Sequence, residues 1–114
     1  KRDPYQDFEK TAAFLEGVLK NAAKENGVDL QVNRFGSMIN PFFTKEKVVD
    51  FKTAQTSDTG KFKTFFWKMM ENGVFLPPSQ FESWFLGTAM TKRDMYKVRK
   101  VIHIAMKAVA DKSR

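Results

Sequence analysis

The sequence contains no cysteine and a single histidine, His103, among its 114 residues. The absence of cysteine excludes disulfide bonds, thiol catalysis and cysteine-ligated metal sites. One histidine leaves no histidine–carboxylate cluster for zinc, and it leaves little material for a nucleophilic triad. Because His103 lies between Ile102 and Ile104, we expect it to be a partly buried or surface residue with a structural role.

Long apolar runs and glycine-rich loops are also missing. No apolar stretch approaches the roughly 20 residues that span a bilayer. The N-terminal KRDPYQDFEK is charged and lacks the apolar centre of a signal peptide. The glycines are isolated, and no GxxxxGK phosphate-binding pattern occurs. We therefore expect a cytoplasmic protein with no membrane partner.

The length suits one domain, residues 1–114, with a core of its own. The sequence starts at Lys1 and its first methionine is Met38, so we expect a piece of a longer protein. The net charge of +7 would usually point to nucleic acid or another anionic partner. That inference is weaker for a piece, because the remainder can carry acidic charge.

Hydrophobic periodicity predicts three helices and several short strands. The helices are expected at Tyr5–Asn26, from Ser57 or Asp58 to Asn72, and at Thr91–Val109. Strands are expected at Leu30–Val32, Ser37–Thr44, Val74–Leu76 and Trp84–Gly87, with a turn at Asn33–Gly36 and an irregular segment at Lys45–Thr56. Pro41 should lie at a sheet edge or a bulge. The order favours an α+β fold, in which about three helices pack on one face of a short, mainly antiparallel sheet.

The twelve phenylalanines are more than three helices need. We expect some of them to face another domain or subunit.

The last predicted helix is rich in basic residues, namely Lys92, Arg93, Lys97, Arg99, Lys100 and Lys107. With Trp67 and Tyr96 they could form a nucleic-acid surface. A solvated helix face is the alternative, and no known nucleic-acid motif supports the sharper interpretation.

A specific segment, GVFLPPSQFESWFLGTAMT, runs from Gly73 to Thr91. Its Pro77-Pro78-Ser79 forces a stiff turn, and one carboxylate, Glu82, then stands among large apolar residues. A charge in such surroundings is costly unless it is paired or faces a polar cavity.

This segment resembles glutamate-1-semialdehyde 2,1-aminomutase. Further matching blocks are Val32–Met38, Phe42–Thr44, Ser57–Thr59, Lys61-Phe62, Phe65-Phe66, Gly73–Glu82 and Phe85-Leu86, with Thr91 and Asp94 at the last helix. The resemblance implies the small C-terminal domain of a fold-type-I aminotransferase, a homodimer that uses pyridoxal 5'-phosphate. Its reaction converts glutamate-1-semialdehyde to 5-aminolevulinate in tetrapyrrole (porphyrin) biosynthesis. The Schiff-base lysine and most phosphate ligands would belong to an absent large domain, so this piece alone should be inactive and bind no cofactor.

The resemblance assigns one site residue, Glu82, which would lie near the active-site entrance and meet an amino group of substrate or intermediate. A structural role for Glu82 within the Ser79–Glu82 turn, as a salt bridge or a cap, stays open. Ser79 and Gln80 are expected to shape that turn.

Three positions depart from the family pattern: Ser83-Trp84 follows the glutamate, Met90 stands where many relatives have histidine, and Asn40-Pro41 interrupts a strand. A related class-III aminotransferase is therefore one alternative, and a basic nucleic-acid-binding module is another.

Overall fold

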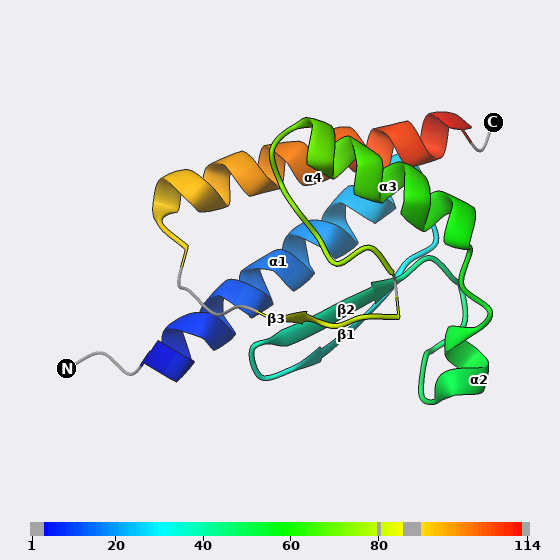
Figure 1. The fold of residues 1–114 in the computed structure, drawn as a ribbon, viewed down its shortest axis with the longest axis horizontal. Helices are drawn as coiled ribbons and strands as arrows, with labels where there is room; N and C mark the ends of the chain where they lie inside the picture. The colour runs from blue at the N-terminus through cyan, green and yellow to red at the C-terminus, as the bar shows by residue number, and fades with distance from the viewer. Residues whose placement is uncertain (1–3, 80, 86–89, 113–114) are drawn as a thin grey trace.

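The computed structural model describes residues 4–79, 81–85 and 90–112. In this part of the chain the elements are helix α1 (Pro4–Asn26), strands β1 (Gln31–Phe35) and β2 (Met38–Phe42), helices α2 (Phe51–Ala54) and α3 (Thr59–Glu71), strand β3 (Trp84–Phe85) and helix α4 (Lys92–Lys112). The strands form an antiparallel sheet in the order β1-β2-β3 (Figure 1). The predicted α+β class is confirmed.

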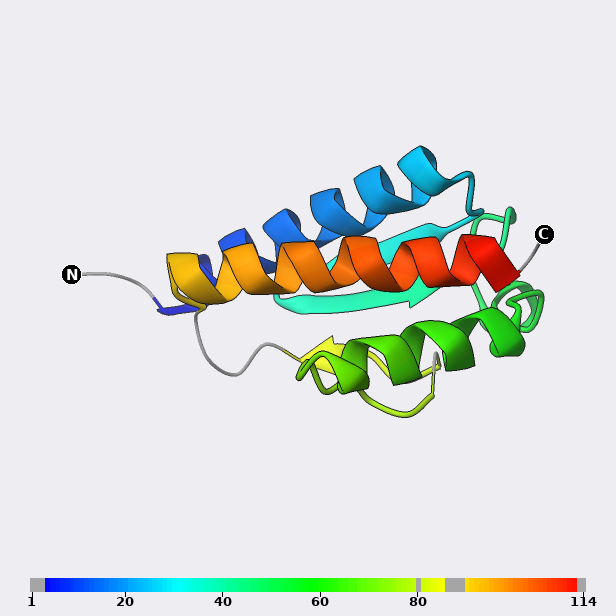
Figure 2. The same cartoon turned by 90° about the horizontal axis from the view of Figure 1, so that it is seen from above.

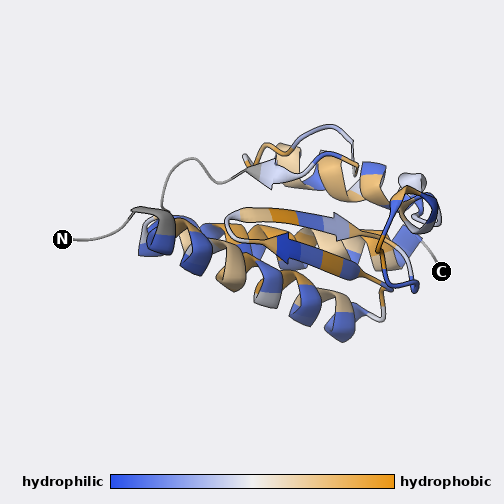
Figure 3. Ribbon diagram, turned by 90° about the horizontal axis from the view of Figure 1, so that it is seen from below, coloured by the Kyte–Doolittle hydropathy of each residue, from blue (hydrophilic) through white to orange (hydrophobic). Residues whose placement is uncertain are grey.

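The long helices cover one face of the sheet. Helix α1 packs against β1 and β2, and α4 lies between α1 and α3 (Figure 2). The core between the layers consists of side chains that are almost completely buried, among them Leu15, Leu19, Ile39, Phe65, Met69, Ile102 and Met106. Figure 3 looks onto the opposite face, where no described helix crosses the β1–β2 hairpin.

Two glycines end helices as the sequence predicts. Gly27 and Gly73 have φ angles of 66° and 84°, in the left-handed region that favours glycine. In each case the next residue closes the helix, because Val28 N–H donates to the Ala23 carbonyl and Val74 N–H to the Met69 carbonyl, both at 2.9 Å. These bonds satisfy carbonyls that a helix end otherwise leaves unpaired.

The predicted turn at Asn33–Gly36 is wrong in its position. Strand β1 continues to Phe35, and the turn is the two-residue Gly36-Ser37, with φ of 60° at Gly36. A two-residue hairpin with glycine at its first position needs no further turn residues. Asn33 and Arg34 therefore remain in the strand, opposite Asn40 and Ile39.

Other expectations need smaller corrections. Val74–Leu76 forms no strand, because Val74 N–H caps α3 instead of joining a ladder. The segment predicted as irregular contains the short helix α2, which Asp50 caps. Pro41 lies on the central strand β2 and pairs with Val32 of β1. On its other side β3 pairs only with Met38 and Ile39, so at Pro41 the described part of β2 is an edge, as predicted. Leu86 and Gly87 of the predicted last strand lie outside the described residues.

Candidate functional site: the Glu82 turn and the open sheet face

A closed turn carries the predicted site residue Glu82. Its backbone N–H donates to the Ser79 carbonyl at 3.1 Å, and the Phe81 N–H donates to Ser79 Oγ, also at 3.1 Å. Serine is suited to this position because its hydroxyl accepts from the backbone two residues later. The prediction that Ser79 shapes the turn is confirmed. Gln80 lies outside the described residues.

The Glu82 side chain is exposed. Among the residues that the structure describes, no side chain forms an ion pair or hydrogen bond with its carboxylate. The structural alternative of an internal salt bridge therefore gains no support. A charged, solvated carboxylate is free to accept hydrogen bonds from a cation.

The residue after Glu82 connects this turn to the sheet. Asn40 Nδ2 donates to Ser83 Oγ at 3.4 Å, which is long for a hydrogen bond. The next residue, Trp84, pairs with Ile39 of β2 and is 6% exposed. Two positions that depart from the family pattern, Asn40 and Ser83, are thus in contact with each other.

The uncovered side of the β1–β2 hairpin bears Asn33, Phe35, Met38 and Asn40, and we call it the open sheet face. Asn33 lies opposite Asn40, and Phe35 opposite Met38, so the four share one side of the ladder. A hollow of about 360 Å³ lies over them and reaches Ser83. Phe35 is 85% exposed, an unusual exposure for so large an apolar side chain.

A second hollow, of about 390 Å³, shares Asn33 and Phe42 with the first and so continues this surface. It is lined by Phe42, Val49, Phe51 and Phe81, and the Phe51 and Phe81 rings lie 6.4 Å apart. Glu82 therefore stands in sequence between Phe81 and Ser83, each of which lines one hollow. The site combines one unpaired carboxylate with an apolar, uncovered surface.

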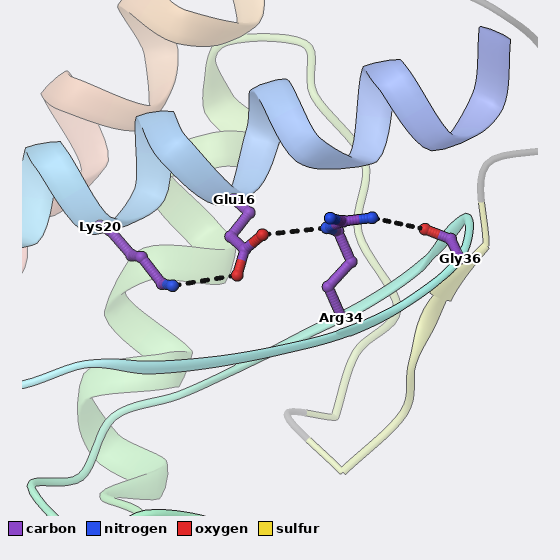
Figure 4. Close-up of polar contacts among 4 residues, drawn as sticks. All are labelled: Glu16, Lys20, Arg34 and Gly36. Carbon is purple, nitrogen blue, oxygen red and sulfur yellow. Dashed lines mark hydrogen bonds and ion pairs between the residues drawn. The ribbon is translucent and has the colours of Figure 1, made fainter. Parts of the chain in front are cut away.

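An ion-pair cluster fixes β1 to α1 on the helix side of the sheet (Figure 4). Arg34 Nε lies 2.9 Å from Glu16 Oε1, and Lys20 Nζ lies 3.0 Å from Glu16 Oε2. Hydrogen bonds from Arg34 first, and then from Lys20, lower the pKa of Glu16 below its ordinary value. Arg34 also donates to the Gly36 carbonyl at 3.2 Å, and this hydrogen bond stabilises the turn between β1 and β2.

None of the described lysines is buried. A lysine that forms a Schiff base needs a lowered pKa, which burial provides. The described residues also contain no group of three or more side chains suited to a metal ion. None of the described helices is both long and apolar enough to cross a membrane.

The remaining predicted residues lie away from the Glu82 turn. His103 is half-buried on α4, with Nδ1 3.2 Å from Glu25 Oε2 of α1, which confirms the predicted partly buried position. Along α4 the basic residues Lys92, Arg93, Lys97, Arg99, Lys100 and Lys107 are exposed. Lys107 pairs with Asp111 at 3.1 Å, and the Arg99 guanidinium lies 5.7 Å from the centre of the Tyr96 ring.

Comparisons of sequence and of fold both find glutamate-1-semialdehyde aminomutases. No family model matches the chain. Over 93 residues it is 53% identical to the glutamate-1-semialdehyde 2,1-aminomutase of Sulfurihydrogenibium sp. (strain YO3AOP1), a match that covers 82% of this chain and 22% of the relative. The chain is homologous to one part of this aminomutase. The relative from Pelotomaculum thermopropionicum is 43% identical over 107 residues, covering 94% of this chain and 25% of its own.

Solved structures share the fold. A glutamate-1-semialdehyde-aminomutase from Pseudomonas aeruginosa superposes with a TM-score of 0.80 at 17% identity, over 96% of this chain and 24% of its own. An omega-transaminase from Sphaerobacter thermophilus gives 0.74 at 16% identity, over 92% and 24%. The resemblance found in the sequence is confirmed, and the chain spans about a quarter of these proteins.

The contact between Asn40 and Ser83 is the part of this site that sequence reasoning missed. Both residues stood out as departures from the aminomutase pattern, but nothing in their spacing of 43 residues says that they meet. The available signal was that one unusual polar residue, Asn40, lies inside a predicted strand and the other, Ser83, directly precedes one.

Proposed function

We propose that this chain is the small C-terminal domain of a glutamate-1-semialdehyde 2,1-aminomutase, which converts glutamate-1-semialdehyde to 5-aminolevulinate for tetrapyrrole synthesis. The observation that carries the proposal is the 53% identity to the Sulfurihydrogenibium enzyme over 82% of the chain. Identity at this level over most of the chain is more than a shared fold alone would require.

The rest of that enzyme is the natural partner of the open sheet face. The relatives are about four times longer than their match to this chain. The open sheet face exposes Phe35, and the adjoining hollow exposes Phe51 and part of Phe81. Asn40 Oδ1 is buried and finds no donor among the described residues, and an unpaired buried acceptor costs about 1–3 kcal/mol. A large domain that covered this face would bury the rings and could supply the donor.

The cofactor would be pyridoxal 5'-phosphate, held outside this chain. One solved relative by fold is a transaminase with PLP bound, and the Pseudomonas enzyme has also been solved in complex with PMP. When bound, this group supplies an electron sink for moving an amino group between carbons. None of the described lysines is buried, so none of them suits the Schiff base, which we assign to the part of the enzyme outside this chain.

Within that enzyme Glu82 would meet the amino group of the substrate. Its carboxylate is exposed and has no partner among the described residues, and its sequence neighbours Ser83 and Phe81 each line a hollow. A carboxylate accepts charge-assisted hydrogen bonds from an ammonium, which are about twice as strong as neutral ones. Glu82 would thus bind and orient the substrate rather than form or break a bond. We further propose a cytoplasmic homodimer.

A class-III aminotransferase remains the second candidate, because an omega-transaminase shares the fold with a TM-score of 0.74. The products separate the two. An aminomutase isomerises one molecule, whereas a transaminase needs an amino donor and an acceptor in equal amounts. The complete protein that carries this chain should therefore make 5-aminolevulinate from glutamate-1-semialdehyde with no added amino acceptor.

The test measures 5-aminolevulinate after the complete protein is incubated with glutamate-1-semialdehyde and pyridoxamine phosphate. Product that forms only when a keto acid or a second amine is added would support the transaminase instead. Binding of the complete protein to a single-stranded oligonucleotide that weakens as salt rises, with no 5-aminolevulinate formed, would favour the basic face of α4 as the functional surface.

A further inference from the structure

The segment around Glu82 is held at both ends by side-chain hydrogen bonds. Before Glu82, Ser79 Oγ accepts from the Phe81 N–H at 3.1 Å, and the Ser79 carbonyl accepts from the Glu82 N–H at the same distance. After Glu82, Ser83 Oγ accepts from Asn40 of β2 at 3.4 Å. Trp84 then enters the ladder opposite Ile39.

We propose that Ser79 and the Asn40–Ser83 pair are positioning residues that fix the direction in which Glu82 presents its carboxylate to a ligand ammonium. The proposal rests on the proposed function, because it assigns support to the same site. Neither Ser79 nor the pair is required to touch the ligand.

The physical reason is that the Glu82 carboxylate has no support of its own within the described residues. Its direction is therefore set by the backbone at residue 82, which is fixed by the bonds on either side of it. A misplacement of about 1 Å in a catalytic site can cost a hundredfold in rate. The two bonds at Ser79 are of ordinary length and the Asn40–Ser83 bond is long, so Ser79 should have the larger effect.

The Asn40–Ser83 pair links two positions where this chain departs from its family. An asparagine inside β2 is unfavourable for a strand, and it leaves Oδ1 buried without a donor. Its Nδ2, however, reaches the residue that follows Glu82. The two departures thus act as one unit, which ties the turn to the central strand.

The first experiment compares Ser79→Ala with Ser79→Asn in the complete, cofactor-loaded protein. Alanine removes the acceptor for the Phe81 N–H, whereas asparagine can replace it with its side-chain oxygen. We expect kcat/KM for glutamate-1-semialdehyde to fall about threefold to tenfold in Ser79→Ala, the range of one lost hydrogen bond, and to recover in Ser79→Asn. The Kd for 5-aminolevulinate should rise in Ser79→Ala and return toward the parent value in Ser79→Asn.

The second experiment measures Asn40→Ala, Ser83→Ala and the double variant. Each single variant should lower kcat/KM by about twofold to threefold, and the double variant by no more than either one, because the three remove the same bond. Ser83→Ala should fold, since it removes only one hydroxyl from a side chain that is not fully buried. It keeps the test valid if Asn40→Ala does not fold.

The Glu82→Gln background separates positioning from general structure. If these residues act through Glu82, Ser79→Ala and Ser83→Ala should cause no further loss there. Equal losses in both backgrounds, or no loss from Ser79→Ala in the parent, would overturn the proposal. A parent that makes no 5-aminolevulinate would refute the proposed function, and the Glu82 amide would then decide the inference alone. Its hydrogen exchange should speed up about tenfold in Ser79→Ala, and unchanged exchange would overturn it.

Discussion

The helix layer and the open sheet face of this chain differ in how completely their large apolar side chains are buried. In the helix layer, the large side chains of α3 and α4 close a core with Phe65, Met69, Ile102 and Met106 each 0% exposed. On the other side of the sheet, Phe35 is 85% exposed, and Asn40 Oδ1 finds no donor among the described residues. Ser83, the residue after the predicted site residue Glu82, lines the hollow over this open sheet face. The helix layer therefore stabilises the fold, whereas the proposed function is assigned to the open sheet face.

The largest effect on stability should come from a substitution in the helix layer. Phe65→Ala removes a ring that packs 5.6 Å from Phe43 in the core, so we expect the free energy of unfolding to drop by about 3–5 kcal/mol. Phe75→Ala is the matched control, because Phe75 is 76% exposed, and its effect should stay within about 0.5 kcal/mol. Urea unfolding of the 114-residue chain measures both. Similar losses in the two variants would mean that the helix layer is not the core.

Glu82→Gln should change the activity and leave the stability unchanged. Losing a charge-assisted hydrogen bond should lower kcat/KM for glutamate-1-semialdehyde about tenfold to a hundredfold in the complete protein. The unfolding midpoint should not move, because the carboxylate is exposed. Steady-state kinetics and thermal unfolding are measured on the same samples. A lower midpoint with unchanged kinetics would assign Glu82 a structural role.

Phe35→Ser sharpens the comparison by changing the open sheet face itself. In the 114-residue chain the substitution should be neutral within about 0.5 kcal/mol, because the ring is already in water. If the rest of the enzyme covers this ring, the complete protein should lose about 1.5–3 kcal/mol. Denaturant unfolding of both proteins, side by side, gives the difference. Equal and negligible effects in both would show that Phe35 stays exposed.

The smallest effect is expected between the two sides, where Glu16 of α1 pairs with Arg34 of β1. The pKa of Glu16 is lowered from 4.5 by Arg34 and then by Lys20. The pair therefore stabilises the fold above about pH 4.5, and this contribution is lost as the pH falls through the lowered pKa. Glu16→Gln should cost about 0.2–1 kcal/mol at pH 7, the usual range for exposed pairs, and less at low pH.

A matched control is Glu71→Gln, which removes a pair with Lys68 inside α3 rather than one between two elements. Chemical denaturation across the acid range compares the two variants. A Glu16→Gln deficit that grows as the pH falls would contradict the assignment.

The helix layer was also the part of the molecule that the sequence predicted best. Apolar spacing gave the three long helices, and Gly27 and Gly73 gave two of their ends, because these signals are local. The hairpin was less predictable, since Asn33 and Gly36 both favour turns and only the cross-strand pairing of Phe35 with Met38 shows where β1 ends. Residue types alone do not encode such pairing.

At the site, the resemblance pointed to Glu82, while the composition pointed to exposed phenylalanines at an interface. Neither could reveal that Asn40 reaches Ser83, because that contact depends on the order of the strands in the sheet. A residue that departs from a family pattern can be interpreted only when its neighbours in space are known.

The most direct test of this account is the formation of 5-aminolevulinate from glutamate-1-semialdehyde by the complete protein, with Glu82 intact and as Glu82→Gln. The account predicts product without an added amino acceptor, and a tenfold to hundredfold lower kcat/KM in the variant. A folded, cofactor-loaded protein that makes no 5-aminolevulinate, or makes it equally well without the Glu82 carboxylate, would contradict it.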